Sequence, residues 1–127
     1  SMNYHPLNRQ AMLKLYDYLD TLFQLNKKND AFPENGPLLF ANDILQELQI
    51  SDNSEKSEAI KRAIQNCITL GMPLSKNFKR VYRFTSEGIL PDWQTSPLAG
   101  YLIIINCSPK HEYVAKAQLF FAVKFIK

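Results

Sequence analysis

The chain has 127 residues, of which 46% are hydrophobic and 21% charged, a globular composition that excludes intrinsic disorder. The formal net charge at pH 7 is only +3, but the charge is unevenly distributed. Residues 1–58 carry four excess acidic charges and residues 87–127 one excess basic charge, whereas residues 59–86 hold six cations and no acidic residue. This basic block favours a polyanionic partner such as nucleic acid, although a solvated basic face would give the same pattern.

Several features of the sequence point to a reducing, cytoplasmic location. The N-terminus lacks the basic region and apolar core of a secretory signal. The longest purely apolar run, residues 101–105, is far too short to cross a membrane. Cys67 and Cys107 are too few and too far apart to form a disulfide framework. We interpret Ser1 as a cloning remnant that precedes the native Met2.

The N-terminal part, residues 1–37, is predicted to form a long amphipathic helix followed by a loop. Pro6 suits the first helical position, and apolar side chains then recur at the 3.6-residue helical period. Two prolines and an Asn-Gly pair predict the loop over 29–37. Residues 38–127 are expected to form the rest of one globular unit, beginning with a very short strand over 38–40.

Two helices joined by a tight polar turn are predicted next, in a helix-turn-helix pattern. The first spans about 42–49. The second spans about 54–70, with an N-cap among the polar residues 51–54 and an end at Gly71. The side chains expected to be buried by the first helix are Ile44, Leu45 and Leu48.

The segment that follows the helix pair is predicted to be an exposed β-hairpin arm. Residues 78–85 alternate as in a strand, and neither face is cleanly apolar: one carries Phe78, Arg80, Tyr82 and Phe84, and the other Lys79, Val81, Arg83 and Thr85. Residues 86–94 are expected to be a connector, with Trp93 packed over the core.

Two further helices are predicted at the C-terminus, because a serine followed by a proline occurs at 96–97 and again at 108–109. The helix over about 97–106 is apolar all round and should be buried centrally, although its three isoleucines also suit a strand. The helix over about 109–125 has surplus apolar residues, which predicts a packing helix or an interface with another chain. The predicted fold class is therefore α+β, predominantly helical, with about five helices, a helix-turn-helix-like pair and a short β-hairpin arm.

Eight residues are candidates for contacts with nucleic acid, because they lie on the second helix of the pair or on the arm. The helix donors could reach phosphates or base edges from a major groove. The arm interleaves cations with aromatic residues, which suits a single strand or a wing on duplex DNA. The alternatives are a solvated helix face and a hairpin whose aromatics only pack on the core. The candidates are Lys61, Arg62, Gln65, Asn66, Lys76, Lys79, Arg80 and Arg83.

The sequence contains no catalytic or cofactor motif that we recognise. The four glycines do not cluster into a phosphate loop, and the histidines and cysteines lack metal-ligand spacing. A dyad of Cys107 and His111 is conceivable, but Pro109 intervenes and Cys107 suits packing at a helix end. We therefore expect no enzyme, no cofactor and no metal.

The C-terminal third carries a residue pattern found in a known family. The matching residues are Tyr101-Leu102-Ile103, Asn106, Pro109 and Ala115-x-x-Gln118-x-Phe120-Phe121-Ala122-Val123. Upstream, residues 41–51 and the pattern Arg62-Ala63-x-x-x-Cys67-x-x-x-Gly71 also match. Over roughly 39–123 the chain thus resembles the DNA-damage-inducible protein D (DinD) family. More loosely, it is similar to the N-terminal BRO domains of phage and large DNA viruses.

The chain departs from the family pattern at three places. Cys107-Ser108 replaces a Gly-Asp before the proline, and Gln49-Ile50 replaces a Gly-Tyr after the short helix, so that turn is expected to differ. The N-terminal helix has no counterpart in the family.

The resemblance implies a non-enzymatic DNA-binding or regulatory domain of a bacterial, phage or mobile-element protein, linked to the DNA-damage response or to gene regulation. The alternative is a protein-interaction module that inhibits or adapts a DNA-metabolism protein, such as a recombinase filament or a repressor. The expected partners are DNA and a protein of DNA repair or repression, with no membrane. A homodimer through the N-terminal or the C-terminal helix is also considered.

Overall fold

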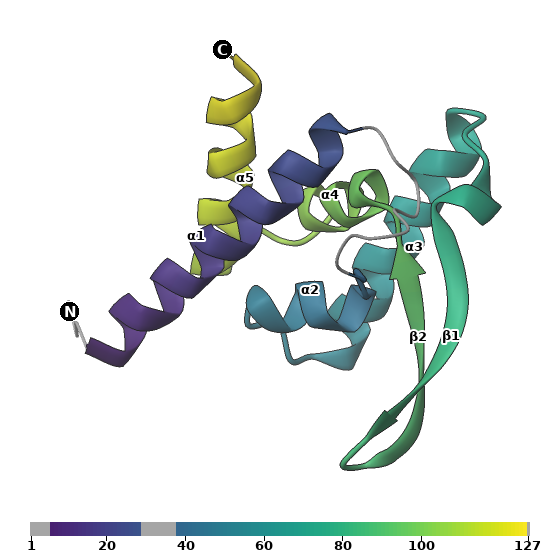
Figure 1. The fold of residues 1–127 in the computed structure, drawn as a ribbon, viewed down its shortest axis with the longest axis horizontal. Helices are drawn as coiled ribbons and strands as arrows, with labels where there is room; N and C mark the ends of the chain where they lie inside the picture. The colour runs from purple at the N-terminus through teal and green to yellow at the C-terminus, as the bar shows by residue number, and fades with distance from the viewer. Residues whose placement is uncertain (1–5, 29–37, 127) are drawn as a thin grey trace.

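The computed structural model describes the backbone of residues 6–28 and 38–126, and side chains from residue 9 onward. These residues form five α-helices and a two-stranded antiparallel hairpin, which confirms the predominantly helical α+β fold. The predicted loop over 29–37 and Ser1 lie outside the described residues. The α-helices are α1 (Pro6–Lys27), α2 (Ala41–Glu47), α3 (Asn53–Thr69), α4 (Pro97–Ile105) and α5 (Glu112–Ile126); a 3-10 helix, η1 (Leu74–Lys76), and the strands β1 (Phe78–Thr85) and β2 (Gly88–Thr95) lie between α3 and α4 (Figure 1).

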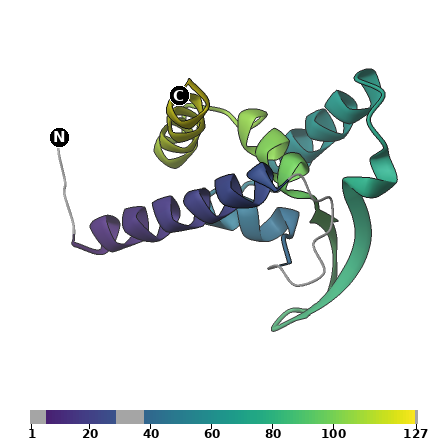
Figure 2. The ribbon, with the colours of Figure 1, turned by 45° about the horizontal axis from the view of Figure 1, so that its top comes forward.

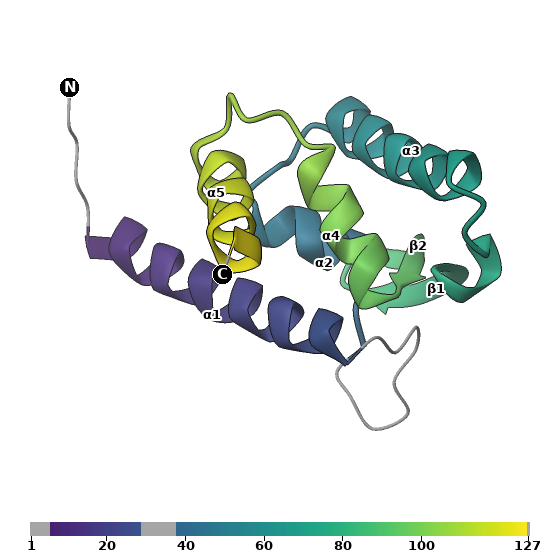
Figure 3. The same cartoon turned by 90° about the horizontal axis from the view of Figure 1, so that it is seen from above.

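The central element of the fold is α4, as predicted. It contacts α1, α2, α3, α5 and β2, and it lies between α1 and α3 when the molecule is seen from above (Figure 3). Six of its nine residues are buried, including Ile103 and Ile104. The Ser96 hydroxyl accepts a hydrogen bond from the Ala99 N–H at 3.0 Å and Pro97 opens the helix, so the capping signal prevails over the strand propensity of the isoleucines.

The surplus of apolar residues on α5 is partly covered by α1, which runs along one side of the molecule (Figure 2). The rings of Tyr16 and Phe120 lie 6.1 Å apart, and those of Phe23 and Phe125 lie 5.3 Å apart. The fully buried leucines of α1 are Leu15, Leu19 and Leu22. A packing helix, one of the two predicted explanations for the surplus, is therefore present within the chain.

The connector predicted over 86–94 is wrong, because this stretch supplies the turn and most of the second strand. Strand β2 pairs with the whole of β1 in antiparallel register. The Thr85 hydroxyl accepts from the Glu87 N–H at 3.0 Å and donates to the Gly88 carbonyl at 2.9 Å, which closes the turn. Pro91 favoured a loop in the sequence, yet proline is tolerated on an edge strand such as β2. The short strand predicted over 38–40 is reduced to one bridge between Phe40 and Gln94.

The last helix begins later than predicted, at Glu112 rather than at Pro109. Ser108 closes a turn instead of capping the helix, because its carbonyl accepts from the His111 N–H at 3.3 Å. The helical ladder then starts with the bond from the Ala115 N–H to the His111 carbonyl at 3.0 Å. The predicted position of Trp93 is confirmed: it is half-buried and packs against the core.

Helices α2 and α3 end in the same hydrogen-bonded C-terminal motif. After α3, the Gly71 N–H donates to the Ile68 carbonyl at 3.1 Å and the Met72 N–H to the Cys67 carbonyl at 2.9 Å, with Gly71 at φ 68°. These are the two bonds of a Schellman motif, whose left-handed residue is usually glycine. The predicted end of α3 at Gly71 is therefore confirmed.

The turn after α2 has the same geometry without a glycine. The Gln49 N–H donates to the Gln46 carbonyl at 2.9 Å, and the Ile50 N–H to the Leu45 carbonyl at 3.0 Å. Both Leu45 and Ile50 are buried, which is the apolar contact that accompanies this motif. Gln49 has φ 59°, a left-handed conformation that is unfavourable for a residue with a Cβ atom.

Replacing Gln49 by glycine should therefore stabilise the protein. The relief of left-handed strain, less the extra chain entropy of glycine, is expected to raise the free energy of unfolding by about 0.5–1 kcal/mol. Urea denaturation followed by circular dichroism measures the change. The reverse change at the equivalent position after α3, Gly71→Ala, should lower the free energy of unfolding. Gln49→Ala should not raise it. A loss of stability in Gln49→Gly would contradict the expectation.

Candidate nucleic-acid interface

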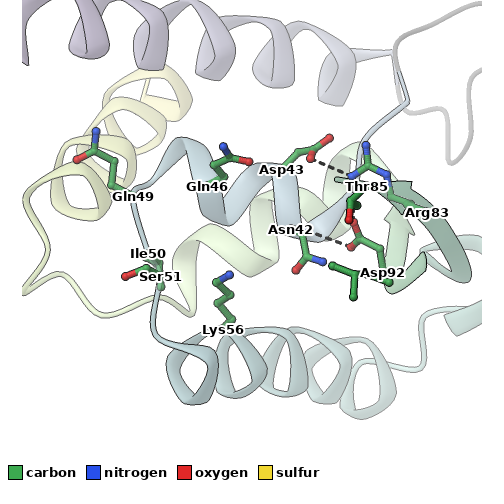
Figure 4. Close-up of a pocket in the computed structure, with 11 residues that line it drawn as sticks. Asn42, Asp43, Gln46, Gln49, Ile50, Ser51, Lys56, Arg83, Thr85 and Asp92 are labelled. Carbon is green, nitrogen blue, oxygen red and sulfur yellow. Dashed lines mark hydrogen bonds and ion pairs between the residues drawn. The ribbon is translucent and has the colours of Figure 1, made fainter. Parts of the chain in front are cut away.

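The base of the hairpin is joined to the start of α2 by one buried carboxylate, that of Asp92 on β2. Its side chain is only 3% exposed. Asp92 Oδ1 accepts from the Asn42 N–H at 3.1 Å and from the Trp93 N–H at 2.7 Å (Figure 4). Because the N-cap residue of α2, Phe40, offers no side-chain oxygen, the hairpin itself caps this helix. The angle between hairpin and helix pair is thereby fixed.

Arg83 completes this junction. Its Nη1 donates to Asp43 Oδ1 at 2.9 Å and to Asp92 Oδ2 at 3.1 Å, and its guanidinium lies 3.9 Å from the centroid of the Phe40 ring (Figure 4). The hydrogen bond that Arg83 donates to Asp43 is the main cause of a raised Arg83 pKa. Arg83 therefore differs from its predicted role on a free basic surface: two carboxylates, one on α2 and one on β2, hold it in place.

Asn66 also serves the fold. Its Oδ1 accepts from Asn106 Nδ2 at 2.7 Å, which ties the last turns of α3 to the C-terminal end of α4. The side chain is half-buried, so the exposed polar face predicted for the second helix of the pair is narrower than expected.

Lys61 and Arg80, two of the predicted residues, meet in a cleft between α3 and the hairpin. The cleft has a volume of about 710 Å³, and its apolar lining includes Ile60 of α3 and Trp93 of β2. The Arg80 guanidinium lies 4.8 Å from the centroid of the Trp93 ring, which holds this cation against the hairpin. One helix and one strand pair thus bring two separate parts of the basic block together.

A third cation in this cleft, Lys56, was not among the predicted residues. It lies on the first turns of α3, just before the acid-free block, in a part of the sequence with excess acidic charge. It also lines a second cleft of about 520 Å³ between α2, α3 and the hairpin, where its side chain extends from α3 toward α2 (Figure 4). The helical spacing from Lys56 to Lys61 could not have suggested it, because side chains five residues apart point about 140° away from one another around a helix.

The acidic residues of the α3–hairpin cleft only partly balance these cations. Asp92 lines it but already accepts from Arg83. Glu87, at the hairpin turn, is the second carboxylate among the lining residues. The cleft formed by α3 and the hairpin therefore keeps an excess of positive charge.

The other four predicted residues do not line this cleft. Arg62 pairs with Glu58 at 3.2 Å on the exposed surface of α3, and Gln65 Nε2 donates to the Thr69 hydroxyl at 3.1 Å. Exposed pairs of this kind hold a cation weakly, so Arg62 stays accessible to a stronger anion. Lys76 on η1 and Lys79 on β1 are exposed.

Cys107 and His111 do not face one another as a catalytic dyad would. Cys107 Sγ donates to the Ile103 carbonyl at 3.2 Å, and burial raises the pKa of this thiol to about 12. His111 Nε2 lies 2.5 Å from Glu55 Oε2, a hydrogen bond that is the main cause of a lowered Glu55 pKa. Across the described ranges, no three His, Cys, Asp or Glu side chains are grouped to hold a metal ion.

Comparisons with known proteins find no matching family model, no matching curated protein and no matching solved structure. Among the described helices, none combines the length and apolarity needed to cross a membrane. What the chain does must therefore be inferred from its own geometry.

Proposed function

We propose that the chain is a non-enzymatic DNA-binding domain in which α2 and α3 form a helix-turn-helix and the hairpin is the adjoining wing. One observation carries the proposal: Lys56, Lys61 and Arg80 converge on a cleft between α3 and the hairpin. Cations from two elements in one concave surface suit a phosphate backbone, which presents closely spaced negative charges.

The arrangement of the helices supports the same function. In a helix-turn-helix the second helix enters the major groove, and its N-terminal residues contact base edges. Helix α3 has an exposed face that includes Ser54, Ser57, Lys61 and Gln65, whose hydroxyl, ammonium and amide groups can bond to phosphates and bases. The Schellman motif shapes the turn from α2 to α3, and the Asp92 junction holds the hairpin against the start of α2.

The resemblance to the DinD family and, more loosely, to BRO domains agrees with this proposal. It implies a cytoplasmic regulatory domain of a bacterial, phage or mobile-element protein, with a role in the DNA-damage response or in gene regulation.

The salt dependence of DNA binding tests the proposed function. If the three cleft cations each contact a phosphate, log affinity should fall against log salt with a slope of about −3; with Arg62, Lys76 and Lys79 added, the slope should be about −5. Fluorescence anisotropy with a labelled mixed-sequence duplex measures it. Absence of binding at low salt would reject the proposal, and a slope near zero would reject the phosphate contacts.

A second candidate function is favoured by the outer face of α5. Leu119, Val123 and Ile126 follow one another at helical spacing and remain exposed, as does Leu13 on α1. Such an apolar stripe suits a protein partner, and a second copy of the chain is the partner we favour. A dimer would also be compatible with DNA binding, since helix-turn-helix dimers bind paired half-sites.

A further inference from the structure

The outer half of the hairpin exposes large apolar side chains. Phe84 is 87% exposed, Tyr82 69% and Ile89 60%. Phe84 lies opposite Ile89, and Tyr82 lies opposite Pro91, across the two strands. Side chains two residues apart and directly opposite share one face of a sheet, so these four residues form one patch, the tip patch. The turn that joins the two strands beyond this patch extends away from the helices (Figure 1).

The tip patch is separate from the contacts that hold the hairpin in place. Phe78 at the start of β1 packs edge-on against Trp93, with ring centroids 6.1 Å apart, and Arg83, between Tyr82 and Phe84, lies on the opposite face of the strand, where it is bonded to two carboxylates. Apolar side chains gathered at the exposed end of an anchored arm mark an interaction site.

Charge decides which partner fits the tip patch. Lys79 and Arg80 precede the patch on the same strand, and β1 has no acidic residue. In a symmetric contact with a second copy, these cations would face the same cations of the partner. A polyanion that also offers apolar surfaces fits the tip patch better. In DNA, the phosphates can contact the cations, and the stacked bases between the two backbones can contact the apolar side chains.

We propose that the tip patch enters the minor groove beside the major groove occupied by α3, and that Phe84 inserts between adjacent base pairs and bends the duplex. This inference rests on the proposed function. Apolar wedges inserted from the minor groove unstack a base step and kink the duplex by about 20–90°. Lys79 and Arg80 would contact the phosphates at the edge of the groove.

The test measures bending and binding on the same samples. The probe is a mixed-sequence duplex with a flexible TA step at its centre and a donor and an acceptor dye at its ends. Energy transfer between the dyes measures bending, and anisotropy measures binding. The wild-type chain should raise energy transfer at saturation. Phe84→Ala should leave energy transfer near that of free DNA. It should weaken binding by less than about tenfold, because the loss of stacking between Phe84 and the bases is offset by the energy saved when the base step stays stacked.

The matched control is Leu38→Ala, which removes an exposed apolar side chain outside the hairpin and should bend DNA as the wild type does. Wild-type binding without bending, or equal bending by Phe84→Ala, would overturn the wedge and leave the proposed function standing. Absence of duplex binding by the wild type would instead overturn the proposed function. Phe84-dependent self-association, or Phe84-dependent binding to phosphatidylserine vesicles, without DNA bending would assign the tip patch to those partners and overturn the inference.

Discussion

Replacing Lys56 and Lys61 together by glutamate should lower the affinity for duplex DNA by about 100-fold at ~0.1 M salt. Each released counterion contributes roughly tenfold to affinity under these conditions, and the new carboxylates add repulsion from the phosphates. The magnitude of the salt slope should fall by about 2, because two phosphate contacts are lost. Both lysines lie on α3, and within the part of the chain that the structure describes neither has a buried partner to leave unpaired, so the fold should persist, as thermal unfolding would verify.

A matched variant distinguishes the effect of the cleft lysines on DNA affinity from the effect of net charge alone. Lys14→Glu with Lys28→Glu changes the total charge by the same amount on α1 and the residue that follows it, and α4 separates α1 from α3 (Figure 3). This control should bind DNA within about threefold of the wild type, since exposed charges farther than a Debye length act weakly. Equal losses in both variants would contradict a local interface. Unchanged binding by the Lys56 and Lys61 variant would exclude the cleft and favour the apolar stripe of α5 as the functional surface.

Replacing Asp92 by alanine should lower the free energy of unfolding by about 3 kcal/mol. The change removes the cap of α2 and leaves the N–H groups of Asn42 and Trp93 without their acceptor. It also takes one of two carboxylates from Arg83. Chemical denaturation monitored by circular dichroism and tryptophan fluorescence measures the loss, and Trp93 reports directly on the hairpin base.

Asp43→Ala is the matched control, since Asp43 contacts the same guanidinium. Its side chain is 45% exposed and keeps much of its hydration, so its loss should cost less than about 1 kcal/mol. The two replaced carboxylates differ mainly in that Asp92 is buried and accepts the bond that caps α2. Similar losses in the two would contradict the role we assign to Asp92.

Much of the helical part of the fold could be predicted from the sequence, because its signals are local. The first four helices lie within two residues of their predicted bounds, and Ser96 and Gly71 cap them as expected. The predicted start of the last helix was wrong because Ser108 can either cap a helix or close a turn, and the neighbouring residues do not decide between the two.

The second strand could not be predicted in the same way. Its pairing with β1 depends on partners across the turn, and Pro91 within it favoured a loop. The candidate site was predicted only in part for a related reason. A charge count along the sequence identified Lys61 and Arg80 but could not show that Lys56 lies in the same cleft.

The sequence by itself determined the helices, their caps and the presence of a basic block, since periodicity, capping and charge depend on neighbouring residues. Only the tertiary structure decided which of the predicted polar side chains remain available. Arg83 is bonded to Asp43, 40 positions away, and Asn66 to Asn106, again 40 positions away. Such bonds form because folding buries the groups together and each then needs a partner, and no pattern along the chain specifies which partner that is.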